Sequence, residues 1–217
     1  MSMPEDPYEL LHFNMVRAHD TFKLGYDKII EVAANVPQND LNNFLGYCEA
    51  WAKSLEDHHD NEESVVFPFL NTKMDISKEK EQHEVIHGTL NKLLTIIYAA
   101  KANHAKFDSQ ELLQLMTDFR EPLYTHLDEE VEHITADQMK AAGFVAADIV
   151  KMIADLEAYA KSHANPFLQV PYMRSHIPAE YKDVWPPLPW VLKKVIIPYV
   201  LAKRYSGYWK YSPYPMS

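Results

Sequence analysis

The sequence contains very little cysteine and glycine. Its 217 residues include one cysteine and five glycines. A lone Cys48 cannot form an internal disulfide, so nothing in the chain requires an oxidising compartment, and we expect a cytoplasmic protein. The start of the chain, MSMPEDPYELL, lacks the basic and then apolar run of a signal peptide. No uninterrupted apolar run reaches the roughly 18 residues of a membrane-spanning helix, so we expect a soluble chain.

Basic side chains are also in the minority. The sequence has 21 Lys and Arg against 31 Asp and Glu, which gives a net charge of -10. Proteins bind nucleic acid largely through clustered Lys and Arg, which displace counterions from the phosphates. The charge therefore argues against a nucleic-acid partner.

Apolar side chains recur with helical spacing in four long segments, and a shorter segment follows them. Few glycines and long proline-free stretches favour helices over strands. The predicted helices span about residues 7–35, 41–69, 77–100, 109–134 and 146–162. Because the connections between the first four are short, neighbouring helices should be antiparallel. The sequence predicts an all-α fold, in which residues 1–140 form an up-down-up-down four-helix bundle and residues 141–165 hold an additional helix.

Residues 166–217 differ from the rest in composition. They carry nine of the fourteen prolines, seven Lys or Arg, and only two acidic residues. The mixture of aromatic and basic side chains fits either a helix on a membrane surface or an extended strap across the bundle. We favour the strap, because the acidic bundle offers a surface of opposite charge.

Histidine is abundant, with eleven residues, and its placement is regular. Helical bundles build metal sites from a histidine and a carboxylate one turn apart, because both then project from the same face. Such units, and single histidines, lie in the apolar stripes of the four long segments, where an unpaired polar group is costly to bury. Counted from the helix ends, all fall within one slab about 10 Å thick. The predicted metal ligands are His19, His58, Glu62, His83, His87, His126 and Glu130.

The second helix also contains a rival pair, His59 and Glu63. At about 100° per residue, Glu62 faces the apolar stripe more directly than Glu63 does. We therefore pair Glu62 with His58 and expect His59 to flank the site. The other histidines are expected to be structural, and Cys48 to be an apolar filler. Glu129 and His133 are kept as candidates for orienting the ligand imidazoles.

The donor set constrains the metal. Five imidazoles, two carboxylates and no thiolate favour two iron ions, with zinc or manganese as alternatives. In this hypothesis Glu62, Glu130 and an oxo or hydroxo group bridge the ions, and about one coordination position stays open.

Four segments carry a resemblance to a known family: NMVRAHD, HHDNEESVVFPFL, EQHEVIH and HLDEEVEH. Together they resemble the hemerythrin family, specifically the hemerythrin-like HHE cation-binding domain, over about residues 8–137. The resemblance implies the same seven ligands. It also places the chain in the wider HHE branch, because the oxygen-carrying hemerythrins have an aspartate five residues after the last histidine, where Val131 stands here.

Three functions fit this site. We favour a di-iron protein that binds dioxygen or a related small diatomic, as a store, sensor or scavenger. An oxygenase or peroxidase-type enzyme at the same site is the second possibility, so enzymatic activity stays open. The third is an iron sensor or interaction module that folds only with metal.

Overall fold

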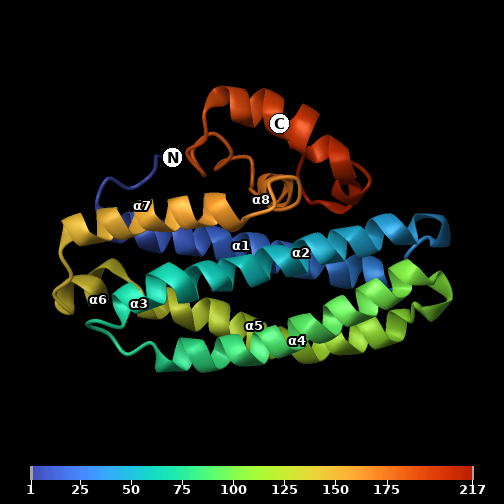
Figure 1. Ribbon diagram of the computed structural model, residues 1–217, viewed down its shortest axis with the longest axis horizontal. Helices are drawn as coiled ribbons and strands as arrows, with labels where there is room; N and C mark the ends of the chain where they lie inside the picture. The colour runs from blue at the N-terminus through green and yellow to red at the C-terminus, as the bar shows by residue number, and fades with distance from the viewer. Residues whose placement is uncertain (1, 217) are drawn as a thin grey trace.

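The computed structural model describes residues 2–216, and these residues form helices and connecting loops without a strand. The all-α prediction is confirmed. Figure 1 shows four long helices lying side by side: α1 (Pro7–Ala33), α2 (Leu41–Asn61), α4 (Ser77–Ala102) and α5 (Ser109–His133). The chain crosses the length of the molecule in each helix and turns at its ends, so that consecutive helices run in opposite directions.

Local capping explains where α1 and α5 begin. The Asp6 side chain accepts a hydrogen bond from the Tyr8 backbone N–H, and Pro7 occupies the first turn of α1. The Asp108 side chain accepts hydrogen bonds from the N–H groups of Gln110 and Glu111 at the start of α5. These contacts satisfy amide groups that have no partner within the helix.

The second helix is not continuous to residue 69. It changes to a π-helix at Glu62–Val66 and returns to α-helix in α3 (Phe67–Leu70). Pro68 has no N–H to donate to the carbonyl of Ser64, and its ring would clash with that carbonyl in an unbroken α-helix. The wider π turn removes this conflict, and it begins at Glu62.

Two further helices follow α5. The short α6 (Ala136–Ala141) was not predicted; the Thr135 side chain caps it by accepting from the Gln138 N–H. Gly143 then adopts a φ of 79°, a conformation that glycine tolerates without strain. The helix α7 (Ala146–His163) agrees with the expected additional helix.

The hydrophobic core has two clusters of buried side chains. The larger contains Phe22, Trp51 and Leu90, and the smaller contains Phe67 and residues of α6 and α7. In all four long helices the predicted ligands lie near the point along the chain where residues of one cluster give way to those of the other. The metal-ligand candidates therefore interrupt an otherwise apolar interior.

The C-terminal segment, described over residues 166–216, contacts the face of the bundle formed by α1 and α2. It contains α8 (Gln169–Ser175), a π-helix at Leu192–Leu201 and short 3-10 helices at Ala202–Tyr205 and Tyr208–Tyr211. Figure 1 shows this segment, coloured orange to red, on the side of α1 and α2 away from α4 and α5.

Two glycines allow this segment to approach the bundle closely. A Cβ at Gly25 would lie 2.3 Å from the Tyr172 hydroxyl oxygen, and one at Gly46 would lie 2.1 Å from the Tyr208 ring. The Tyr172 hydroxyl donates to the carbonyl of Thr21. In the part of the chain that the structure describes, no helix has the length and apolar character needed to cross a membrane.

Candidate metal centre

The structure brings the predicted ligands of all four long helices together. His19 Nε2 lies 3.1 Å from His58 Nε2 and 3.3 Å from Glu130 Oε2. His126 Nε2 lies 3.2 Å from His83 Nε2 and 3.6 Å from Glu130 Oε2. Each of the seven residues belongs to at least one group of three donors whose ligand atoms lie within 4.8 Å of one another. The expected convergence is therefore present.

The donors form two neighbouring groups with Glu62 between them. Glu62 Oε1 is 3.0 Å from His58 Nε2, which belongs with His19. Glu62 Oε2 is 3.6 Å from His83 Nε2, which belongs with His126. The two oxygens of one carboxylate thus face different pairs of imidazoles.

His59 lies inside the cluster, contrary to the expectation that it would flank the site. It is fully buried, and its ring stacks on that of His83 at a centroid distance of 3.9 Å. Its ligand atom lies within 4.8 Å of those of His83 and His126. A helical count could have found it: at about 100° per residue His59 is about 40° from Leu55, whereas His58 is about 60° away on the other side. The same count that selected Glu62 thus places both histidines near the apolar stripe.

His87 lies further out than the other predicted ligands. Its side chain is 25% exposed, and its Nε2 is 4.0 Å from Glu63 Oε1. With Glu63 and His83 it forms a donor group at the edge of the cluster. Glu63 itself is largely exposed, as the helical count predicts, while Glu62 is buried.

Hydrogen bonds on the outer side of the imidazoles orient their inner nitrogens. His19 Nδ1 donates to the carbonyl of Leu127, at 2.8 Å. His83 Nδ1 is 2.9 Å from Glu63 Oε1, and His126 Nδ1 is 3.2 Å from Gln82 Oε1. An imidazole that donates through Nδ1 keeps a lone pair on Nε2, which then faces the interior. This arrangement is typical of histidines that bind metals.

Of the two candidates for an orienting role, Glu129 contacts a ligand imidazole only through another side chain, that of Gln82. It accepts a hydrogen bond from Gln82 Nε2 at 2.6 Å and pairs with Lys78, so it fixes the amide that contacts His126. His133 instead pairs with Glu79, at 2.6 Å between Nδ1 and Oε1. No sequence pattern singles out Gln82, because its role depends on the spacing between α4 and α5.

Burial sets the protonation of these groups in the metal-free chain. It lowers the pKa of His58 and His83 to about 3 and that of His126 to about 2, so these imidazoles are neutral. Burial, and then the nearby Glu62, raise the pKa of Glu130 to about 7. The pKa of Glu62 is also well above its ordinary value, because this carboxyl is buried and lies near Glu63. Carboxylates in such a place ionise readily only beside a positive charge.

Several buried oxygen and nitrogen atoms that could ligate a metal have no hydrogen-bond partner in the described structure. They include both oxygens of Glu62, both oxygens of Glu130 and both ring nitrogens of His59. Unpartnered polar atoms are expensive to bury, and a bound cation would satisfy them. Neutral imidazoles and carboxylates are also the donors that Fe, Zn and Mn accept. The residues present therefore fit a metal centre.

Several of the remaining histidines, and Cys48, lie outside the donor groups and make hydrogen bonds or apolar contacts. His176 is buried in the C-terminal segment, where its Nδ1 donates to the Tyr172 carbonyl and its Nε2 accepts from the Tyr47 hydroxyl at 2.7 Å. Cys48 lies in the larger apolar cluster, where burial raises the pKa of its thiol. His104 and His163 hydrogen-bond near the surface.

Comparison with known proteins identifies the family. A sequence model of the hemerythrin HHE cation-binding domain matches residues 11–136. The chain is also similar to the dimeric xanthone biosynthesis cluster protein R11 of Cryptosporiopsis sp. (strain 8999). The two are 23% identical over 212 residues, which cover 94% of this chain and 78% of that protein. The comparison with solved structures found no match. Since the family match spans more than half of the chain and includes every predicted ligand, the protein belongs to the hemerythrin HHE cation-binding domain family.

Proposed function

We propose that this chain is a non-haem di-iron protein that binds dioxygen or a related small diatomic molecule, as a store, sensor or scavenger. The observation that carries the proposal is the position of Glu62. Its two oxygens face His58 and His83, which belong to different donor groups. A carboxylate placed in this way is suited to bridge two ions, as in other di-metal bundles.

The donor groups suggest how the chain would hold the two ions. His19 and His58 would bind one ion, and His83 and His126 the other. Glu62 and Glu130 would bridge them together with an oxo or hydroxo group. His59 and His87 are then alternative ligands on the His83 side. When bound, the iron pair supplies a reversible change of oxidation state and an open coordination position.

The burial of the site supports a small ligand over a bulky organic substrate. His19, Glu62, His83, His126 and Glu130 are each at most 2% exposed. A molecule larger than a few atoms would have to displace packed helices to reach them. A cavity of about 310 Å³ lined by residues including Glu79 and Glu129 lies outside the donor set. The chain therefore serves to exclude water and select by size.

Metal analysis combined with optical spectroscopy tests this proposal. Protein expressed with added iron should contain about two irons per chain and show a near-ultraviolet band from the bridged ferric pair. The spectrum should change reversibly when the reduced protein is exposed to oxygen and degassed. A colourless protein with stoichiometric zinc would contradict the proposal. Steady consumption of peroxide or oxygen would favour the enzyme instead, and iron-dependent folding without any response to oxygen would favour the iron sensor.

A further inference from the structure

The C-terminal segment exposes an unusual set of large apolar side chains. Of the nine such side chains exposed in the described structure, five lie within eleven consecutive residues. Trp190 is 66% exposed and Tyr199 is 70% exposed. We call this set the outer face; it consists of Trp190, Val191, Val195, Tyr199 and Val200.

Val195, Tyr199 and Val200 lie in the π-helix at Leu192–Leu201, and Trp190 and Val191 directly precede it. Its hydrogen bonds run between residues five apart, so side chains four or five apart share a face. The spacing from Val191 to Val195 and then to Tyr199 follows this repeat. Ile197 and Ala202, also five apart, are buried. This part of the chain thus has two apolar sides, one packed inward at Ile197 and Ala202 and the other exposed as the outer face.

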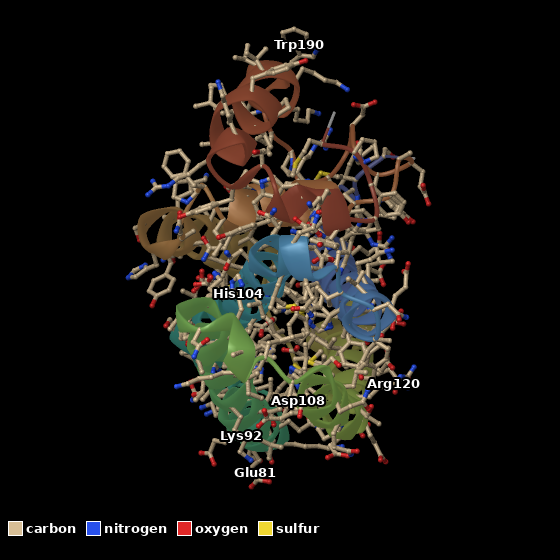
Figure 2. All side chains as sticks on the ribbon, turned by 90° about the vertical axis from the view of Figure 1, so that its right-hand side faces the viewer. Glu81, Lys92, His104, Asp108, Arg120 and Trp190 are labelled. Carbon is tan, nitrogen blue, oxygen red and sulfur yellow. The ribbon has the colours of Figure 1, made fainter. Side chains whose placement is uncertain are left out.

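The outer face points away from the bundle. Figure 2 shows Trp190 at one extreme of the molecule, on the opposite end from Glu81 and Lys92. Whatever contacts this face must therefore come from outside the chain.

Charge identifies the kind of surface that fits. After Asp183 the sequence has no acidic residue, and it has five basic ones: Lys193, Lys194, Lys203, Arg204 and Lys210. Residues 184–217 thus carry a net charge of +5, whereas the whole chain carries -10. Lys203 and Arg204 are exposed and follow Val200, the last residue of the outer face, by three and four positions. An anionic surface would attract this segment and repel the rest of the molecule.

We propose that the outer face binds the headgroup region of an anionic lipid bilayer. Tryptophan and tyrosine prefer the membrane–water interface, and basic side chains next to them pair with acidic lipids. A helix of this kind lies in the interface without crossing it. A second copy of the chain fits less well, because symmetric pairing would bring like charges together. Five side chains are also far fewer than the roughly 20–30 residues per side of a stable protein interface.

Vesicle sedimentation of the full chain tests the proposal. The bound fraction should be at least about tenfold greater with phosphatidylcholine–phosphatidylserine vesicles than with phosphatidylcholine alone, and should fall with added salt. The double variants W190S/Y199S and K203E/R204E should each lose this binding. V145S/V150S is the matched control, because it removes two exposed valines, one at the N-cap of α7 and one within it, and should bind normally.

Two further measurements make the outcome unambiguous. Circular dichroism should show unchanged helix content in all variants, since the substituted side chains are exposed. Binding to neither vesicle type would overturn the proposal, as would equal binding by wild type and K203E/R204E. A concentration-dependent dimer in sedimentation velocity that W190S/Y199S abolishes, without any lipid binding, would also overturn it and assign the face to self-association.

Discussion

The centre of the bundle and the outer face of the C-terminal segment are opposite exceptions to the usual placement of side chains. The first buries polar groups, and the second exposes apolar ones. In the centre, the carboxylates of Glu62 and Glu130 and the imidazole of His59 are buried without hydrogen-bond partners. In the outer face, tryptophan, tyrosine and valine are exposed on a basic segment. Burying unpaired polar groups costs free energy. Leaving a large apolar patch exposed loses the favourable free energy that its burial would give. In our proposals each region gains stability from what binds it, a cation in the first case and a lipid surface in the second.

The largest expected effect is the acid sensitivity of the metal-free centre. Burial lowers the pKa of His58 and His83 to about 3 and that of His126 to about 2, and it also lowers the pKa of His19 and His59. The folded state therefore binds fewer protons than the unfolded state once the pH drops below about 6.5, the ordinary value for histidine. Stability that is present above that pH is lost towards pH 3, at about 1.4 kcal/mol per pH unit for each net proton.

The raised pKa values of Glu62 and Glu130 act in the opposite direction, because these carboxyls hold protons in the folded state. Two carboxyls offset only part of the effect of five imidazoles. Urea unfolding of chelator-treated protein should therefore show a much lower midpoint at pH 5 than at pH 7. An unchanged or higher midpoint at pH 5 would refute this description of the centre.

The variant E62Q should separate metal binding from folding. We expect its iron affinity to fall more than tenfold, because the amide offers one weak oxygen donor where the carboxylate offered two charged ones. The metal-free variant should be at least as stable as wild type, because the substitution removes a buried ionisable group. Metal titration and thermal unfolding measure the two effects. E84Q, on the exposed side of α4, is the control and should change neither. Equal iron affinity in E62Q and wild type would contradict the assignment.

Comparing H59A with H87A sharpens the ligand set. His59 is fully buried and both of its ring nitrogens lack partners, whereas the His87 side chain is 25% exposed. We expect H59A to lose more iron than H87A when both are dialysed against the same chelator. The reverse order would show that His87 binds the metal and that His59 is a packing residue.

A smaller effect is expected where the C-terminal segment meets the bundle. Y47F would leave the buried Nε2 of His176 without its donor and should cost about 1–3 kcal/mol of unfolding free energy. Y199F removes the same hydroxyl from a side chain that is 70% exposed, so its cost should stay within about 0.5 kcal/mol. Urea unfolding of both variants measures the difference. Equal costs would mean that the C-terminal segment is not anchored through Tyr47.

Much of this molecule could be predicted from the sequence. Capping residues and a proline locate the starts of α1 and α5 at Pro7 and Ser109, because they act within one helical turn. The helix α4 begins at Ser77 as predicted, but its N-cap residue is Ile76, whose side chain makes no capping hydrogen bond. Helical spacing placed Glu62 in the core. These features depend only on neighbours in the chain.

What the sequence did not reveal depends on contacts between distant segments or on irregular backbone. The π-helix at Glu62–Val66 interrupts the regular α-helix that we predicted over residues 41–69. Gln82 contacts His126 only because α4 packs on α5. Which apolar side chains of the C-terminal π-helix are exposed could not be predicted either. The sequence shows that they are apolar, but not which of them pack against the rest of the chain.

The most direct test of the metal centre is anomalous diffraction at the iron absorption edge from crystals of the iron-loaded protein. We predict two iron peaks within the donor cluster, one beside His19 and His58 and the other beside His83 and His126, with Glu62 between them. Iron found only at the protein surface, or a fully loaded protein with no peak among these residues, would contradict the account.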